Sequence, residues 1–221
     1  MRKIVAAIRA SGASAGWQQV KIRRSRSSSM PSSSSCWGSP RLCGLFVSLD
    51  GVFEAPGEWH FPYFNDEMGE AVDSLMKAAD TMLLGRVTYQ EFVAFWPNQS
   101  NDDVDIADYM NKTPKLVVSN TLDMVEWQNS TLIRGDVLTQ LAQIKQQPGK
   151  NISITGSGAL VRTLLAAGLL DELHLLVHPL VVGGGKQRLF DEGGVQQGLE
   201  LVDSQVFGTG VVYLTYQLAV N

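Results

Sequence analysis

Hydrophobic residues in this chain recur with two spacings, and each spacing predicts a different kind of element from residue 44 onward. Between Met68 and Ala79, apolar side chains recur every three or four positions, which is the spacing of a helix with one buried face. Asn65 or Asp66 precedes this run and is placed to cap its first turn. The continuous apolar run at 44–49 stops at a turn pair and instead predicts a short buried strand.

The rest of the chain alternates between the same two patterns. Further strands are predicted at 81–85, 115–119, 131–135, 152–155 and 172–182, and helices at 86–95, at 137–147 after Asp136, and between Gly158 and Gly168. The last two apolar segments, 199–207 and 211–220, flank a Gly-Thr-Gly turn and predict an antiparallel hairpin. This order predicts one α/β domain with a mainly parallel central sheet, helices on both of its faces and a closing antiparallel hairpin.

Residues 1–43 do not share this pattern, because they form a basic, Ser-rich segment without hydrophobic periodicity. Three explanations are open: an organelle-targeting peptide, a disordered tail, or an insertion. The domain is therefore expected to span residues 44–221, although residues 42–43 could still extend its first strand.

Composition narrows the classes of function. Residues 1–43 contain eight basic and no acidic residues, which leaves 10 basic against 22 acidic residues in 44–221. A body that acidic is unsuited to wrapping nucleic acid, and no apolar run approaches the roughly 18 residues that a membrane helix needs. Both cysteines, Cys36 and Cys43, lie in the N-terminal segment, so the body has no thiol for disulfides, zinc clusters or thiol catalysis. We expect a cytoplasmic protein, with organelle targeting by the basic segment as the minor alternative.

A glycine-rich turn joins the predicted strand 152–155 to the helix that follows it. Gly156, Ser157 and Gly158 stand at this junction, where backbone amides and the positive end of the helix would face an anion together. The turn lacks the full dinucleotide fingerprint, because Val161 stands at the third glycine position. It is either a phosphate-binding loop or a tight corner between two buried elements.

Three other strand ends carry residues that could complete a site. Gly85 and Arg86 form a second strand-to-helix junction, with a guanidinium that could grip a phosphate. Ser119 ends its strand at the edge where ligands gather in open α/β sheets. Asp50 ends the first strand and is either a proton source or a turn-forming aspartate.

Three further features have both a functional and a structural interpretation. The triglycine at 183–185 either lets a ligand approach the backbone closely or forms a flexible loop. The aromatic loop 59–64 either stacks on a planar heterocycle or covers the core. His174 and His178 share a strand face, but no carboxylate or cysteine spacing completes a metal site, so packing is the favoured role and no metal is predicted.

Taken together, these segments resemble the dihydrofolate reductase family. They resemble more closely the reductase domain of the bifunctional riboflavin-biosynthesis deaminase–reductase and its stand-alone homologues. The resemblance is carried, in family order, by "GLFVSLDGVFEAPGEWHFPYFNDEMG", "ADTMLLGRVTYQEFVAFWP", "TPKLVVSNTLD", "STLIRGDV", "ITGSGALVRTLLAAGLLDELHLLVHPLVVGGGKQRLF" and "TGVVYLTYQ". In the family, a segment like residues 1–6 leads straight into one like 44–49. Residues 7–43 therefore look like an insertion or a gene-prediction artefact.

The resemblance implies a site for NADPH. Cofactor contacts are implied for Gly85, Arg86, Thr88, Ser119, Thr155, Gly156, Ser157, Gly158 and Ala159, with Ser119 beside the phosphate on the adenosine ribose. Asp50 is implied as the catalytic proton source, and Val47, Gly51, Trp59 and Phe61 are expected to contact the substrate.

The implied activity is hydride transfer from NADPH to a small planar nitrogen heterocycle of the pyrimidine or pteridine type, as in riboflavin biosynthesis. The riboflavin enzymes have a glutamate where this chain has Thr155, so the resemblance leaves the substrate open. The alternative is a non-catalytic NADP(H)-binding sensor. The resemblance also suggests a homodimer formed through the late strands and the hairpin.

Overall fold

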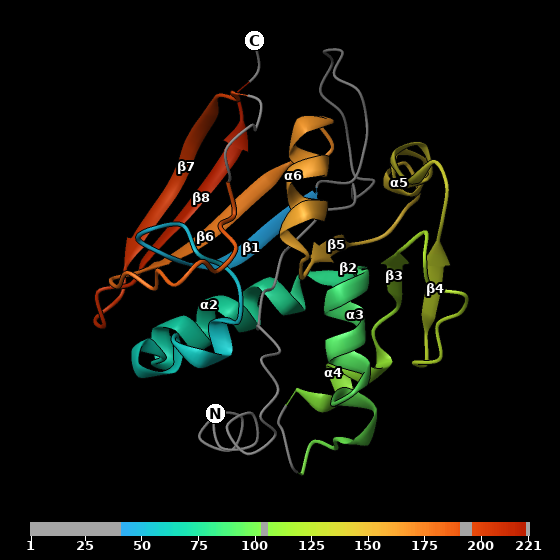
Figure 1. The fold of residues 1–221 in the computed structure, drawn as a ribbon, viewed down its shortest axis with the longest axis horizontal. Coiled ribbons are helices and arrows are strands. Elements are labelled where there is room, and N and C mark those ends of the chain that lie inside the picture. The colour runs from blue at the N-terminus through green and yellow to red at the C-terminus, as the bar shows by residue number, and fades with distance from the viewer. Residues whose placement is uncertain (1–40, 103–105, 191–195, 220–221) are drawn as a thin grey trace, which may run out of the picture.

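In the computed structural model, which describes residues 41–102, 106–190 and 196–219, eight strands form one sheet (Figure 1). The strands are β1 (Arg41–Ser48), β2 (Ala79–Gly85), β3 (Lys115–Val118), β4 (Ser130–Ile133), β5 (Asn151–Ile154), β6 (Glu172–His178), β7 (Leu199–Val206) and β8 (Val212–Leu218). Their order across the sheet is β4-β3-β2-β5-β1-β6-β8-β7. The first six positions are joined by parallel pairings, and β8 pairs antiparallel with both β6 and β7.

Helices cover both faces of this sheet, as the alternating pattern predicts. They are α2 (Asp66–Lys77), α3 (Arg86–Val93), α4 (Ala107–Lys112), α5 (Val137–Lys145) and α6 (Gly158–Ala166). Side chains of α2, α3 and α4 belong to one buried cluster, and those of α5 and α6 to a second. The two clusters lie on opposite faces, because successive residues of β1 alternate between them: Leu45 and Val47 pack with α5 and α6, and Phe46 packs with the others.

The sheet separates at one place in its middle. β1 is paired with β5 only from Arg41 to Cys43, whereas its pairing with β6 continues to Ser48. Beyond Cys43, the rest of β1 therefore has a strand partner on one side only among the described residues. The glycine turn that follows β5 lies at this separation, at the carboxyl end of the parallel strands.

Two helix starts agree with the capping residues predicted from the sequence. The side chain of Asn65 accepts a hydrogen bond from the Met68 amide at 3.0 Å, and that of Asp136 accepts one from the Thr139 amide at 3.1 Å. Each carboxamide or carboxylate satisfies an amide that has no partner inside the helix.

Other boundaries differ from the prediction. β1 begins at Arg41 rather than at residue 44. β6 ends at His178 instead of continuing to residue 182, because Pro179 follows it and has no amide to donate to the neighbouring strand. Helix α4 was not predicted. The expected insertion at residues 7–43 lies, up to residue 40, outside the described residues.

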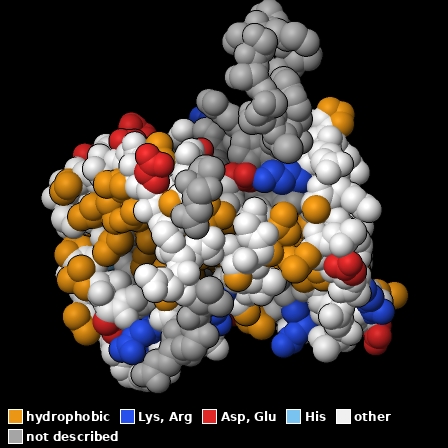
Figure 2. Space-filling model, turned by 90° about the horizontal axis from the view of Figure 1, so that it is seen from above, with side chains coloured by type: hydrophobic (Ala, Val, Ile, Leu, Met, Phe, Trp, Pro, Cys, Tyr) orange, Lys and Arg blue, Asp and Glu red, His pale blue; other side chains and the backbone are white. Residues whose placement is uncertain are grey.

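Strand β7 forms one edge of the sheet and exposes apolar side chains. Leu201, Val202 and Val206 are 50%, 52% and 69% exposed. Figure 2 shows hydrophobic side chains gathered on the side of the molecule where the β7–β8 hairpin lies. Edge strands with exposed aliphatic side chains favour pairing with another surface.

Over the ranges that the structure describes, no helix is both long and apolar enough to span a bilayer.

Candidate active site

Two helices begin at the carboxyl edge of the parallel strands without a capping side chain. Gly85 precedes α3 and Ser157 precedes α6, and neither supplies a side-chain hydrogen bond to the first turn. The first amides of each helix are therefore available to a ligand, and the helix dipole adds positive potential there. This arrangement is the one that binds phosphate groups in many proteins.

The loops before these helices touch each other. The Gly85 amide donates to the Gly156 carbonyl oxygen at 2.8 Å. A Cβ at Gly85 would lie 2.7 Å from Ser157 Oγ and 2.9 Å from the Ser157 amide nitrogen, so a side chain has no room there. Gly158 is equally restricted, since its Cβ would lie 2.3 Å from Cζ of the Phe53 ring. Gly85 is thus required by the contact between the two junctions, and Gly158 by the contact of its helix start with Phe53.

A cavity of about 210 Å³ lies between the start of α3 and the glycine turn. Thr88, Thr155 and Ser157 line it, together with Phe53 and its neighbours from the loop after β1. The Thr155 hydroxyl is fully buried and has no hydrogen-bond partner in the described part of the chain. A buried hydroxyl without a partner is costly, so this atom marks a position that a polar ligand group would satisfy.

Two carboxylates, Glu54 and Glu91, also line this cavity. Burial, and secondly the negative charge of Glu54, raises the pKa of the half-buried Glu91 carboxyl. Glu91 projects from the second turn of α3. The position of Glu91 in this cavity was not predicted, because nothing in the "TYQEFV" pattern distinguishes it from a solvent-facing glutamate.

The residues predicted to bind the phosphate on the adenosine ribose, Arg86 and Ser119, follow the neighbouring strands β2 and β3. Arg86 is exposed, and its guanidinium donates to Gln90 Oε1 at 2.8 Å. Ser119 follows β3, the neighbour of β2, and its hydroxyl oxygen accepts from the Thr121 and Leu122 amides at 3.1 and 3.0 Å. The Ser119 amide donates to Ile133, which places Arg134 at the adjoining strand end. Arg134 was also missed, because it stands in an ordinary strand-to-loop transition.

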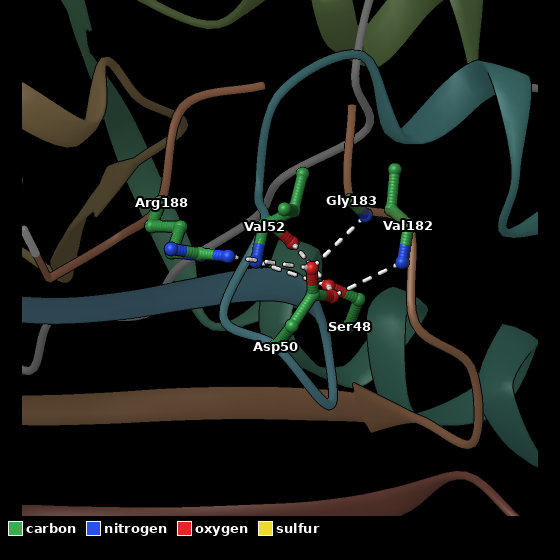
Figure 3. Close-up of polar contacts among 6 residues, drawn as sticks. All are labelled: Ser48, Asp50, Val52, Val182, Gly183 and Arg188. Atoms are coloured by element: carbon green, nitrogen blue, oxygen red, sulfur yellow. Dashed lines mark hydrogen bonds and ion pairs between the residues drawn. The ribbon is translucent and has the colours of Figure 1, made fainter. Parts of the chain in front are cut away.

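Asp50 is held by four groups, shown in Figure 3. Its carboxylate accepts from the Ser48 hydroxyl at 2.6 Å and from the Val182 and Gly183 amides at 3.0 Å each, and Arg188 lies 3.9 Å away. The hydrogen bond from Ser48, followed by that from Val182, lowers the pKa of the Asp50 carboxyl to about 2. A carboxylate so stabilised is a poor proton donor near neutral pH. The geometry instead makes Asp50 a link between the first loop and the triglycine.

The predicted substrate contacts are divided between the two faces of the sheet. Val47 packs in the cluster with α5 and α6, whereas Trp59 and Phe61 lie with the cluster on the opposite face. Gly51 forms the turn after β1 at φ +79°. None of these four residues lines the cavity between α3 and α6.

The aromatic loop covers the end of the sheet with a buried histidine. His60 is 1% exposed and stacks on Phe46, with ring centroids 4.6 Å apart and an interplanar angle of 10°. Neither of its ring nitrogens has a hydrogen-bond partner among the residues that the structure describes. His178 lies edge-on to it at 6.1 Å. Burial, and secondly His178, lowers the pKa of His60 to about 3.

The remaining histidine has ordinary partners. His174 lies 3.1 Å from Glu172 Oε2, and its other ring nitrogen lies 2.8 Å from the Tyr213 hydroxyl. Among the described residues, no group of three or more His, Cys, Asp or Glu side chains is arranged to hold a metal ion.

Two solved structures share this architecture. A protein of Shewanella sp. PV-4 provisionally assigned to riboflavin biosynthesis aligns with 80% of this chain and 97% of its own, at a TM-score of 0.64 and 22% identity. Dihydrofolate reductase from Enterococcus faecalis, solved with NADP(H), aligns with 80% of this chain and 94% of its own, at a TM-score of 0.51 and 15% identity. The fold is therefore of the dihydrofolate reductase type, as the resemblance implied.

The family follows from sequence matches. The model of the RibD C-terminal domain family matches residues 42–213. YyaP of Bacillus subtilis (strain 168), itself uncharacterized, is 30% identical over 178 residues, which cover 79% of this chain and 93% of YyaP. The chain belongs to the RibD C-terminal domain family, which confirms the expected relationship.

Burial of His60 predicts a pH dependence of stability. An unfolded histidine has a pKa near 6.5, whereas that of His60 in the folded protein is about 3. Between these values the unfolded state binds the additional proton. The free energy of unfolding should therefore fall as pH drops below about 6.5, by about 1.4 kcal/mol per pH unit for one proton.

His60→Phe should make this slope shallower by one proton, and should keep the stack on Phe46. Urea unfolding at several pH values measures the slope. Phe61→Leu alters the same loop without removing an ionisable group and should leave the slope unchanged. An identical slope in His60→Phe would show that His60 is not buried in neutral form.

Proposed function

We propose that this protein is an NADPH-dependent reductase that transfers hydride to a small planar nitrogen heterocycle of the pyrimidine or pteridine type. The observation that carries the proposal is the junction of two uncapped helix starts, which are packed together through Gly85 and Gly156. This junction borders the cavity lined by Thr155, whose hydroxyl has no partner among the described residues. Membership of the RibD C-terminal domain family supports a reductase. The related fold of an enzyme solved with NADP(H) supports the choice of cofactor.

The residues present fit a dinucleotide phosphate. The amides at the starts of α3 and α6 would hold its diphosphate, with the close approach allowed by Gly85, Gly156 and Gly158. Arg86 and Ser119 would hold the phosphate on the adenosine ribose, because a guanidinium and a hydroxyl both donate to such a group. The Thr155 hydroxyl would donate to a polar group of the bound cofactor. When bound, NADPH supplies the hydride.

The protein's own contribution is mainly orientation and exclusion of water. Phe53 lines the cavity and packs against Gly158, so the loop after β1 directly contacts the glycine turn. Fixing the two reactants in a dry cleft lowers the entropic part of the barrier. The substrate heterocycle would enter where β1 separates from β5, which is the opening in the sheet nearest the glycine turn.

Glu91, rather than Asp50, is the better source of the proton. Glu91 lines the cavity and has a raised pKa, whereas the carboxylate of Asp50 is occupied by Ser48 and two amides. A bound diphosphate would raise the pKa of Glu91 further, since nearby negative charge favours the neutral acid.

A homodimer is also part of the proposal. The exposed edge of β7 would pair with the same edge of a second copy of the protein. Val202 and Val206 lie four residues apart on this strand, and both side chains are more than half exposed. Burying these side chains against each other removes apolar surface from water.

Cofactor choice tests the role of Arg86. Arg86→Ala should weaken NADPH binding by about 1–3 kcal/mol, as for a charged hydrogen bond, and should leave NADH binding nearly unchanged. Titration calorimetry with both cofactors measures this. Lys77→Ala removes an exposed cation on α2 and should change neither affinity. Equal losses for NADPH and NADH would contradict a role in reading the ribose phosphate.

Turnover tests the reaction and its proton source. NADPH oxidation should be detectable with members of a panel of pteridines and pyrimidines. Glu91→Gln should lower kcat by about a hundredfold without changing NADPH affinity. It should also abolish the decline of the rate as pH rises through the raised pKa of Glu91. Tight NADPH binding without oxidation of any panel member would instead identify a cofactor sensor.

Assembly can be measured directly. Val202→Glu together with Val206→Glu should convert a dimer to a monomer in light scattering coupled to gel filtration, because two carboxylates would be brought against their symmetry mates. Met124→Glu changes a similarly exposed apolar residue far from the hairpin and should leave the mass unchanged. A wild-type protein that is monomeric at all concentrations would reject the dimer.

A further inference from the structure

The two residues that the proposed function assigns to the phosphate on the adenosine ribose belong to different elements. Arg86 begins helix α3, and Ser119 follows the four-residue strand β3. Both side chains can hold one phosphate only when the helix and the strand keep a fixed spacing. The contacts that join these two elements behind the site involve Lys115 and Trp127.

Lys115, the first residue of β3, is a buried cation. It is 1% exposed, and its Nζ donates to the carbonyl oxygens of Asn111, Thr113 and Gln128 at 3.1, 2.7 and 3.3 Å. Burial lowers the pKa of Lys115 to about 8, which leaves the side chain an ammonium at neutral pH. An ammonium has three N–H donors, so each has an acceptor, and in the described part of the chain none of these acceptors is a carboxylate.

Trp127 completes the surroundings of this ammonium. The Nζ of Lys115 lies 4.2 Å from the centroid of the Trp127 ring, which is the geometry of a cation–π contact. The indole Nε1 of Trp127 donates to Asn111 Oδ1 at 2.8 Å. Asn111 Nδ2 in turn donates to the Trp96 carbonyl oxygen at 2.8 Å. The indole is therefore fixed both at its face and at its nitrogen.

The same tryptophan is tied to helix α3. Tyr89 stands three residues after Arg86 on this helix and is 4% exposed. Its hydroxyl oxygen accepts from the Glu126 and Trp127 amides at 2.9 and 3.2 Å. Trp127 thus contacts β3 through Lys115 and α3 through Tyr89.

The position of Ser119 depends on this link because β3 is short. Lys115 stands at one end of the strand, and Ser119 comes directly after the other end. The pairing of β3 with β2 brings Val118 opposite Gly85, so Ser119 lies beside Arg86. A strand of four residues has few backbone hydrogen bonds to hold its register, so an anchor at its start also sets the position of its end.

We propose that Lys115 is a positioning residue for cofactor selection: through Trp127, its ammonium holds β3 and α3 at the spacing at which both proposed ligands of the ribose phosphate reach it. This inference rests on the proposed function. Lys115 does not line the cleft, because it stands at the amino end of β3 and the cleft lies at the carboxyl ends of the strands. Its contribution is to the preference for NADPH over NADH, which lacks that phosphate, and not to hydride transfer.

The test compares NADPH and NADH binding by titration calorimetry in Lys115→Met, which keeps the length of the side chain and removes its charge. NADPH affinity should fall roughly tenfold, as expected for the loss of a charged hydrogen bond, and NADH affinity should hardly change. Tyr89→Phe removes only the hydroxyl that accepts the two amides, and it should lower NADPH affinity by a smaller factor. Lys112→Met removes an exposed cation of α4 and should change neither affinity.

A second readout needs no cofactor. The backbone amide signal of Ser119 in nitrogen–proton correlation spectra should shift in Lys115→Met, although the substitution lies at the other end of β3, and should stay in place in Lys112→Met. If Lys115→Met fails to fold, Tyr89→Phe decides by both measurements.

Three results would overturn the inference: an unmoved Ser119 signal, equal losses of NADPH and NADH affinity, or an unchanged preference for NADPH in the folded variants. The proposed function fails in a different way. A wild-type protein that binds no NADPH would remove the proposed function and this inference together, whereas a wild-type preference that survives both substitutions would remove this inference alone.

Discussion

The arrangement of the cleft depends on the backbone contact between two loops that have a glycine on each side, Gly85 and Gly156. Gly85 donates to Gly156, and any Cβ at Gly85 would overlap with Ser157. This contact fixes α3 and α6 relative to each other, so that their free amides open onto one cavity. A larger residue would push the helix starts apart, and the positive ends of the two dipoles would no longer act on the same group.

The start of helix α6 borders two cavities. One faces α3 and is lined by Glu54 and Glu91, and the other lies beside the triglycine. Asp50 belongs to neither lining. It joins the first loop to the triglycine through the Val182 and Gly183 amides, so the position of one loop is communicated to the other.

The order of the elements and the glycine turns were predictable from the sequence, because both depend on local signals. Features that depend on contacts between distant segments were not. The alternation of apolar runs gave the order of strands and helices, and Asn65 and Asp136 could be placed as caps, because these signals are local. The glycine turns were recognisable because backbone approach requires glycine. The burial of His60 and the proximity of Glu91 to Glu54 were not predictable, since each depends on what a distant segment places beside it.

The position of β1 also has a consequence for biosynthesis. This strand is the first of the sheet to be made, yet it pairs only with β5 and β6, whose residues begin at Asn151 and Glu172. The nascent chain must hold the apolar segment around Phe46 without a strand partner while more than a hundred further residues are translated. Such long-range pairing slows folding and leaves apolar surface exposed to other chains. The order of the strands thus makes the early chain a candidate substrate for chaperones during translation.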